Sequence, residues 1–209
     1  MKHIVVSQRV DVIESYGERR DALDQQWTAF LAEVGLCPIP LPNGLTDVTA
    51  WLKELPVAGV LLTGGNDLSL ASNATNSAPE REQVEELVIQ HALSHKLPIL
   101  GACRGAQYLA TRLGAAIHPI DGHVATRHEL ENSSDVALPQ SVNSFHNFAI
   151  SGDEFPNALQ IIARSSQNSV EAFRSTDGLQ CGIVWHPERE ESFATEDIEL
   201  FRRHFGVAQ

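Results

Sequence analysis

The segment LPILGACRGAQYLATRLG, residues 97–114, constrains the fold most, because it predicts a strand, a sharp turn and a helix in one short run. Residues 97–101 form an apolar run typical of a buried strand, and residues 104–113 have a helical pattern. Cys103 lies at the bend, with Gly101 and Gly105 two positions away on either side. A nucleophile at such a bend has a strained backbone, and glycine neighbours leave room for close packing. We therefore expect Cys103 above the carboxyl edge of a sheet, at the positive N-terminus of a helix.

Short apolar runs alternate with amphipathic stretches along the rest of the chain. The expected strands are residues 3–6, 57–62, 97–101, 116–120, 135–138, 160–164, 170–174 and 180–185, with a short extended piece at 37–41. The expected helices are residues 19–34, 79–94 and 104–113, and one within 193–206. This order predicts one α/β domain over residues 1–209, with a mostly parallel sheet flanked by helices and an antiparallel extension.

Charge and cysteine content exclude several classes of protein. The formal net charge of −12 argues against a surface for nucleic acid or for an anionic membrane. The three cysteines are few and widely spaced, so they indicate neither a disulfide framework nor a zinc site. No apolar run approaches the ~18 residues that span a bilayer. We expect a cytoplasmic protein without a metal or cofactor.

A second segment, CGIVWHPERE at residues 181–190, supplies the base that a catalytic cysteine needs. Pro187 ends the preceding strand, so His186 lies at the carboxyl end of a strand, as Cys103 does. Glu188 follows within reach of the imidazole and can fix its tautomer. Alternatively, these residues form a charged surface turn, and Cys103 is a buried structural cysteine.

A third segment, VAGVLLTGGND at residues 57–67, places paired glycines after a buried strand. The backbone N–H groups of Gly64 and Gly65 are then exposed at the sheet edge, where they can stabilise an oxyanion. Paired glycines also serve as a plain turn.

These segments together resemble the class I glutamine amidotransferase superfamily, and most of all its γ-glutamyl hydrolase branch, peptidase family C26. The resemblance covers nearly the whole chain and includes VNSFHNFAI at residues 142–150. It implies a flavodoxin-like fold and hydrolysis of a γ-glutamyl amide through a glutamyl-thioester. It also implies a triad of Cys103 as nucleophile, His186 as base and acid, and Glu188 as the orienting carboxylate.

The resemblance implies further roles for residues around this triad. Gly65 and Arg104 match the N–H donors of the oxyanion hole, and Gln107 matches a side chain that holds the glutamyl head. Ser144 and Phe145 match the backbone that receives the glutamyl α-carboxylate. The remaining residues that we assign to substrate binding on this basis are Gly64 and His146. The family often has Arg-Asp in the helix after the glycine loop, whereas here Arg81 is followed by Glu82.

Two segments that the family pattern does not fix, residues 7–27 and 121–130, are candidates for contacting the leaving amine. They contain several cations, of which Arg9, His123 and Arg127 are our candidate contacts, and Arg forks suit phosphate oxygens. Alternatively, Arg19 and Arg20 pair with neighbouring acids on a helix. Together with residues 142–150, the segments resemble the γ-glutamyl-CDP-amidate hydrolases. That resemblance implies a nucleotide-linked small-molecule substrate and a role in the phosphoramidate decoration of capsule or O-antigen.

Other functions remain open at this point. A γ-glutamyl-polyamine or γ-glutamyl-γ-aminobutyrate hydrolase would release an aliphatic amine, and the acidic surface would suit a polyamine. A glutaminase subunit would supply ammonia to a separate synthetase, and a non-catalytic module would keep the fold without an active triad. The sequence also leaves open a homodimer.

Overall fold

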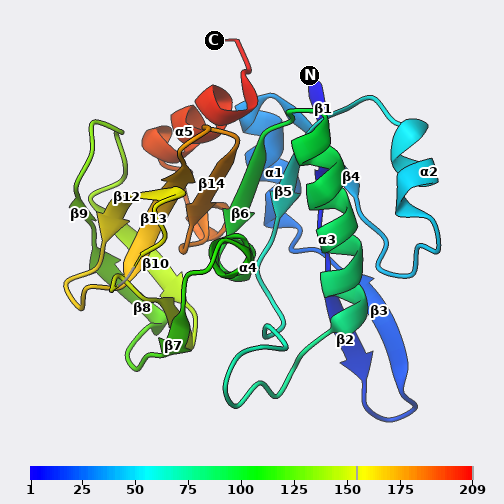
Figure 1. Ribbon diagram of the computed structural model, residues 1–209, viewed down its shortest axis with the longest axis horizontal. Helices are drawn as coiled ribbons and strands as arrows, with labels where there is room; N and C mark the ends of the chain where they lie inside the picture. Colours follow the sequence, from blue (N-terminus) through cyan, green and yellow to red (C-terminus); the bar gives the residue numbers. More distant parts are fainter. Residues whose placement is uncertain (154, 209) are drawn as a thin grey trace.

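The computed structural model describes residues 1–153 and 155–208, and a mainly parallel sheet forms its centre (Figure 1). Five parallel strands occur in the order β4–β1–β5–β6–β14. Their bounds are Lys2–Val6 for β1, Leu36–Pro40 for β4, Val57–Leu62 for β5, Ile99–Ala102 for β6 and Gln180–Ile183 for β14. Because parallel strands end at the same edge of a sheet, the residues that follow β5, β6 and β14 meet there.

Antiparallel strands extend the sheet beyond β14, and two separate ribbons lie beside it. The added strands are β7 at Ile117–Pro119, β9 at Glu131–Asn132, β11 at Phe148–Ile150, β12 at Leu159–Arg164 and β13 at Val170–Ser175. The ribbons are β2–β3, at Arg9–Ile13 and Glu18–Ala22, and β8–β10, at Val124–Glu129 and Ser141–Phe145. In Figure 1 both ribbons lie at the lower edge, on opposite sides of the carboxyl ends of β5 and β6.

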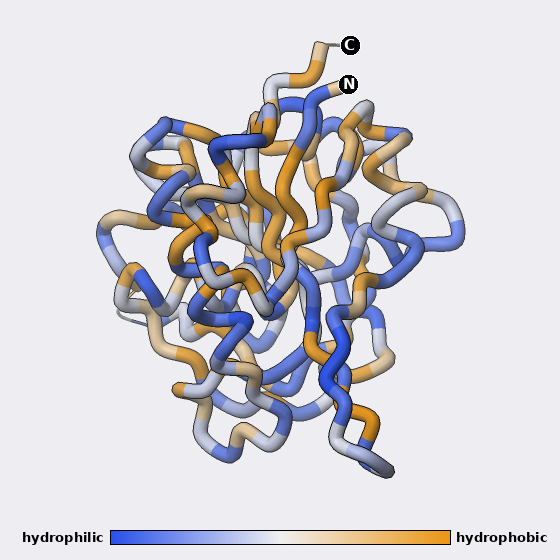
Figure 2. Tube along the Cα trace, turned by 90° about the vertical axis from the view of Figure 1, so that its right-hand side faces the viewer, coloured by the Kyte–Doolittle hydropathy of each residue, from blue (hydrophilic) through white to orange (hydrophobic). Residues whose placement is uncertain are grey.

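Helices cover both faces of the sheet. Side chains alternate between the faces of a strand, so Ile4 and Val6 pack with α1 and α5, whereas Val5 packs with α2, α3 and α4. The bounds are Gln26–Val34 for α1, Val48–Lys53 for α2, Pro79–Ser94 for α3, Arg104–Arg112 for α4 and Thr195–Phe205 for α5, with a 3₁₀ turn at Pro187–Arg189. Figure 2 shows the most hydrophobic segments in the central strands and hydrophilic chain in the ribbons below.

The α/β fold expected from the sequence is confirmed, with two local errors. The expected helix at residues 19–34 is a helix only from Gln26, because its first part forms β3 and pairs with β2 around Gly17, whose φ is 74°. The expected strand at residues 135–138 is a turn. There Asn132 Oδ1 accepts from the N–H of Ser134, and Ser134 Oγ accepts from the N–H of Val136, which are bonds that compete with strand pairing.

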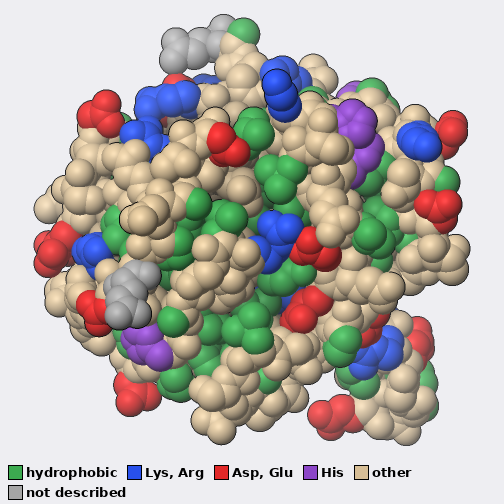
Figure 3. Space-filling view, in the orientation of Figure 1, with side chains coloured by type: hydrophobic (Ala, Val, Ile, Leu, Met, Phe, Trp, Pro, Cys, Tyr) green, Lys and Arg blue, Asp and Glu red, His purple; other side chains and the backbone are tan. Residues whose placement is uncertain are grey.

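The described helices and the face drawn in Figure 3 give no sign of a membrane span or of a basic docking surface. None of the helices in the described residues is both long and apolar enough to cross a bilayer. The face in Figure 3 carries Lys and Arg interspersed with Asp and Glu rather than gathered into a field of one sign. This mixture agrees with the net charge of −12.

Two glycines allow β6, β5 and α4 to approach within backbone contact. A Cβ added at Gly101 would lie 2.4 Å from the carbonyl carbon of Gly105. A Cβ added at Gly105 would lie 2.2 Å from the carbonyl oxygen of Leu62 in β5. Backbone atoms cannot move aside as a flexible side chain can, so both positions require glycine.

We expect Gly105→Ala to lower the free energy of unfolding by more than ~3 kcal/mol, because overpacking costs ~1–3 kcal/mol even where side chains can adjust. The control is Gly44→Ala, since a Cβ at Gly44 meets no described atom within 4 Å. That substitution should change the free energy of unfolding by less than ~0.5 kcal/mol. Urea unfolding measures both, and equal stabilities of the two variants would contradict the packing argument.

Candidate active site

Cys103 lies at the bend between β6 and α4 in a backbone conformation that L-residues rarely adopt. Its φ is 51° and its ψ is −112°. The bend is held because the N–H of Cys103 donates to the carbonyl oxygen of Ile183 in β14, at 2.8 Å. Strain of this kind persists where the surrounding structure requires it, and it is concentrated at functional sites. The side chain is 6% exposed, at the N-terminus of α4, where free N–H groups and the helix dipole favour a thiolate.

His186 and Glu188 form a buried hydrogen-bonded pair just beyond β14. Nδ1 of His186 lies 2.8 Å from Oε1 of Glu188, and the two side chains are 3% and 1% exposed. Burial lowers the pKa of His186, but the charge and hydrogen bond of Cys103, together with Glu188, outweigh burial and raise this pKa to about 10. The site therefore favours the imidazolium form of His186.

The thiol and the imidazole meet beside Gly64. A Cβ added at Gly64 would lie 3.4 Å from Cβ of Cys103 and 2.8 Å from Cε1 of His186. Nε2 of His186 is buried and makes no hydrogen bond of standard geometry among the described residues, although Cys103 is close enough to raise the pKa of the ring. Catalytic hydrogen bonds are often long before substrate binds. Nε2 is thus the ring nitrogen that is free to exchange a proton, whereas Nδ1 is bonded to Glu188.

Asn143 of β10 fixes the backbone of His186. Its Oδ1 accepts from the N–H of His186 at 3.0 Å, and its Nδ2 donates to the carbonyl oxygen of His186 at 2.7 Å. Both backbone groups of the histidine are therefore bonded to one side chain. The ring of Phe145 stands edge-on to the imidazole, with 5.8 Å between ring centroids.

Arg81 of α3 binds the backbone of the glycine loop, residues 63–65, which follows β5. Its guanidinium is fully buried and donates to the carbonyl oxygens of Thr63, at 2.7 Å, of Gly64, at 3.0 Å, and of Gly65. In a trans peptide the C=O of one residue and the N–H of the next point in opposite directions. The N–H groups of Gly64 and Gly65 therefore point away from Arg81.

A buried carboxylate balances this arginine. Glu85 accepts from Nε of Arg81 at 2.8 Å and also bonds to NH1 of Arg104, the residue after Cys103. Burial acts to raise the pKa of Glu85, but the charges of Arg104 and Arg81 outweigh burial and hold this pKa below its usual value. Glu82, next along α3, accepts from the N–H of Ser69 at 2.7 Å, so it secures the loop before α3.

A cavity of about 180 Å³ opens beside the thiol, and we call it the thiol cavity. Its lining residues are Gly65, Asn66, Asp67, Asn76, Cys103, Arg104, Gln107, Phe145, His146, Asn147 and Phe148. Gln107 reaches it from α4 and donates to the carbonyl oxygen of Phe148 at 2.7 Å. Its polar lining and backbone groups suit a small polar acyl group.

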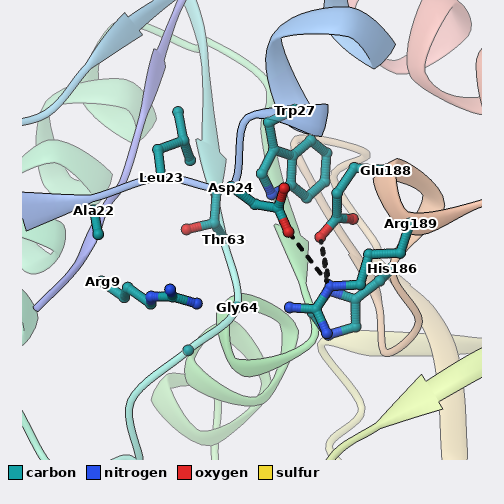
Figure 4. A pocket seen from close by; sticks show the side chains of 11 residues that line it. Arg9, Ala22, Leu23, Asp24, Trp27, Thr63, Gly64, His186, Glu188 and Arg189 are labelled. Carbon is teal, nitrogen blue, oxygen red and sulfur yellow. Dashed lines mark hydrogen bonds and ion pairs between the residues drawn. The ribbon is translucent and has the colours of Figure 1, made fainter. Parts of the chain in front are cut away.

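A second, smaller hollow is lined by Thr63, Gly64, Gly65 and His186 among others, and we call it the arginine pocket (Figure 4). Arg9 and Arg189 face each other across it, and His186 lies on the same side as Arg189. Nε of Arg9 pairs with Asp11 at 3.0 Å. The ion pairs of Arg189 with Asp24 and Glu188 are longer, at 3.7 and 3.6 Å. Two guanidinium groups therefore flank the His186 side of the site.

Three other predicted binding residues do not line the thiol cavity. NH1 of Arg127 donates to both carboxylate oxygens of Glu190, at 2.8 and 2.9 Å. His123 is buried, contacts His146 and does not line the thiol cavity. Ser144 is also buried, and its Oγ donates to the carbonyl oxygen of His123 at 2.7 Å.

Arg19 and Arg20 lie on β3 rather than on a helix. Arg20 pairs with Glu18 at 2.9 Å, and Arg19 pairs with Glu80. Pairing with neighbouring acids is therefore correct for Arg20, although the expected helix is not.

Sequence reasoning missed three residues of this site. Asn143 lies inside the segment 142–150, Arg189 belongs to a segment that is also typical of a charged turn, and Arg81 stands out in the sequence only as the residue before Glu82. An arginine in the helix that follows a glycine loop is the signal that could have indicated Arg81.

Comparison with known proteins agrees with this geometry. The family model of peptidase C26 matches residues 4–188. The chain is 33% identical to the γ-glutamyl-CDP-amidate hydrolase of Campylobacter jejuni subsp. jejuni serotype O:2, over 98% of each chain. It is 24% identical to the γ-glutamyl-γ-aminobutyrate hydrolase of Escherichia coli O157:H7, covering 85% of this chain and 82% of the other.

Solved structures show the same fold. The crystal structure of a Thermoplasma acidophilum protein assigned as a GMP synthase subunit superposes with a TM-score of 0.70 at 22% identity, covering 99% of this chain and 94% of that one. A glutamine amidotransferase from Thermotoga maritima gives a TM-score of 0.67 at 18% identity, covering 98% of this chain and 84% of that one. The chain belongs to the peptidase C26 family and is a hydrolase of the glutamine amidotransferase type.

Proposed function

We propose that this protein hydrolyses a γ-glutamyl amide whose leaving amine carries phosphate, with γ-glutamyl-CDP-amidate as the substrate. The observation that carries the reaction type is the pairing of a strained elbow cysteine with the His186–Glu188 pair across Gly64. The 33% identity to a γ-glutamyl-CDP-amidate hydrolase over 98% of the chain supports the substrate.

The first half of the reaction forms a glutamyl-thioester. The thiolate of Cys103 attacks the γ-carbonyl carbon, and the negative charge moves to the carbonyl oxygen. The N–H groups of Gly65 and Arg104 stabilise this oxyanion. When the C–N bond breaks, His186 gives its proton to the departing amine, and the thioester remains on Cys103.

The second half uses the same histidine as a base. The thioester has no charge on sulfur, so the interaction that raises the pKa of His186 is lost and the imidazole can accept a proton. It then takes a proton from water, whose oxygen attacks the thioester carbonyl. Glutamate leaves, and the thiolate–imidazolium pair forms again.

The arginine pocket supports a phosphate-bearing leaving group. Arg9 and Arg189 flank the His186 side of the site, from which the amine departs. Guanidinium groups bind phosphate oxygens through charge-assisted hydrogen bonds. We place the phosphate contacts at these two residues rather than at Arg127, because they line the arginine pocket beside His186 and Arg127 does not.

We expect Cys103 to react with iodoacetamide at a rate that changes little between pH 7 and 9. The pKa of His186 is about 10, so its positive charge, which stabilises the thiolate, persists through this range and is lost only above it. An ordinary thiol with a pKa of ~8.5 would react faster as pH rises. Burial raises the pKa of Cys181 to about 12, so that thiol should stay unmodified.

The Glu188→Gln variant provides the comparison for this alkylation. Loss of the carboxylate removes one of the two partners that raise the pKa of His186, so the alkylation rate at pH 7 should fall. Peptide mapping of modified cysteines, in a Cys37→Ser background, gives both rates. A rate that rises tenfold per pH unit in the parent protein would rule out the thiolate–imidazolium pair.

We expect the protein to release glutamate from γ-glutamyl-CDP-amidate, and Cys103→Ala to lower the rate by about 10⁴-fold or more, as for other nucleophiles that act within a triad. Acid-quenched samples of the parent should carry one glutamyl group on Cys103 by mass spectrometry. The control Cys37→Ser should keep full activity, because Cys37 is remote in β4.

Three further substrates are tested beside γ-glutamyl-CDP-amidate: γ-glutamyl-γ-aminobutyrate, γ-glutamyl-putrescine and glutamine. Preference for either of the first two would replace the phosphate-bearing leaving group with an aliphatic one. Turnover of glutamine that appears only with an added synthetase would assign a glutaminase subunit instead. No glutamate from any of the four would overturn the proposed reaction.

We expect Arg9→Gln and Arg189→Gln each to raise KM for γ-glutamyl-CDP-amidate by about 10–100-fold, because a hydrogen bond to a charged group is worth ~1.5–3 kcal/mol. Neither change should alter KM for γ-glutamyl-p-nitroanilide, which has no phosphate. Arg20→Gln is the matched control, since Arg20 lies on β3 and pairs with Glu18. Equal losses on both substrates would mean that the arginines act through the fold.

A further inference from the structure

A cluster of three histidines and one carboxylate lies behind the wall of the thiol cavity. The ligand atoms of His123, His128, His146 and Glu171 all lie within 4.8 Å of one another. They come from four places in the fold: the loop before β8, β8 itself, the turn between β10 and β11, and β13. The proposed reaction uses none of these four side chains as an acid, base or nucleophile.

The distances between ligand atoms are close to those of a tetrahedral zinc site. Nδ1 of His123 lies 3.2 Å from Nε2 of His146 and 4.0 Å from Oε1 of Glu171. Nε2 of His128 lies 3.7 Å from Oε2 of Glu171. Ligands about 2.0–2.1 Å from a tetrahedral zinc ion lie about 3.3–3.5 Å apart. Shifts of less than about 1 Å in these side chains would complete that geometry.

A β-bulge turns two of the histidines to the same side. In β8–β10 pairing, Ser144 faces Thr126 and Phe145 faces Val124, so Ala125 is an extra residue. Its φ of 53° is unusual for a residue with a side chain. The extra residue shifts the alternation of side chains by one position. His123 and His128 therefore lie on one face, with 5.0 Å between ring centroids.

The histidines hold lone pairs towards the centre of the cluster. Nδ1 of His146 lies 2.9 Å from the carbonyl oxygen of Phe148, which only accepts, so this nitrogen carries the hydrogen. Its Nε2 therefore carries a lone pair, which lies 3.2 Å from Nδ1 of His123. Nδ1 of His128 likewise donates to the carbonyl oxygen of Glu129 at 3.3 Å. Its Nε2 is buried without a hydrogen-bond partner among the described residues.

Glu171 lacks a partner for one of its two oxygens. The residue is 1% exposed, and Ser169 donates to Oε1 at 2.8 Å. Oε2 is buried without a hydrogen-bond partner in the described part of the chain. A buried carboxylate is costly unless a positive charge compensates it. The histidines that surround it are placed to share such a charge through a common ion.

We propose that His123, His128, His146 and Glu171 bind a zinc ion in a closed, four-ligand site. Three imidazole nitrogens and one carboxylate oxygen are ligands that zinc accepts, and four protein ligands are typical of structural sites. The hydrogen bonds from His146 to Phe148 and from Ser169 to Glu171 are the second-shell contacts that orient such ligands. The ion would tie β8–β10 to β13 of the main sheet, and with it the wall of the thiol cavity.

The test measures metal and stability without any substrate. The full chain, free of any polyhistidine tag and grown with added zinc, should contain about one zinc per chain by inductively coupled plasma mass spectrometry. Removal of zinc with dipicolinate should lower Tm, and added Zn²⁺ should restore it. His128→Gln should weaken zinc binding by more than about 100-fold, because loss of a second-shell partner alone costs ~10–100-fold.

Two further variants make the result specific. Ser169→Ala keeps all four ligands and should weaken zinc binding by ~10–100-fold, as a second-shell loss does. His118→Gln removes an exposed histidine of β7 and should leave zinc content and Tm unchanged. Protein without zinc whose Tm does not respond to added Zn²⁺ would overturn the proposal, even if His128→Gln fails to fold. Iron or manganese bound in place of zinc would overturn the assignment of zinc.

Discussion

A buried ion-pair network between α3 and α4 determines the geometry of the active site. Glu85 bonds to Arg81 on its own helix and to Arg104 at the start of the next. Arg81 binds the carbonyl oxygens of Thr63, Gly64 and Gly65 and so fixes the backbone of that loop. The bond of Glu85 to Arg104 fixes the residue that follows Cys103. Loss of one partner from a buried pair costs ~3–5 kcal/mol, because a charge is left uncompensated. Both proposed oxyanion donors therefore depend on the single carboxylate of Glu85.

The elbow at Cys103 depends on backbone contacts rather than on charge. Gly101 and Gly105 let α4 lie directly against β5 and β6, and this close approach supports the positive φ of Cys103. The bond from the N–H of Cys103 to Ile183 joins the elbow to β14, the strand that ends just before His186. The nucleophile and the base are thus positioned by neighbouring strands of one rigid sheet, so their separation does not depend on a mobile loop.

Sequence reasoning predicted the parts of this site that follow from local pattern. The strand–turn–helix around Cys103 and the proline after His186 have local causes, and the parallel strands place both at one edge. The contact of Asn143 with His186 joins residues 43 positions apart, and no local pattern specifies it. The first part of the expected helix at 19–34 failed because β2 offered backbone pairing that outweighed a weak helical pattern. The zinc ligands also have no local spacing, since a bulge at Ala125 and pairing between distant strands bring them together.

The β8–β10 ribbon carries one wall of the site without belonging to the main sheet, so it needs anchors of its own. Asn143, in the middle of β10, bonds to the backbone of His186 and to Glu190, which also binds Arg127. The histidine cluster brings the ribbon against Glu171, a residue of the main sheet. An isolated two-stranded ribbon is only marginally stable in water. Two anchors, one on each side of Phe145, therefore explain how an exposed ribbon can present a fixed surface to a small substrate.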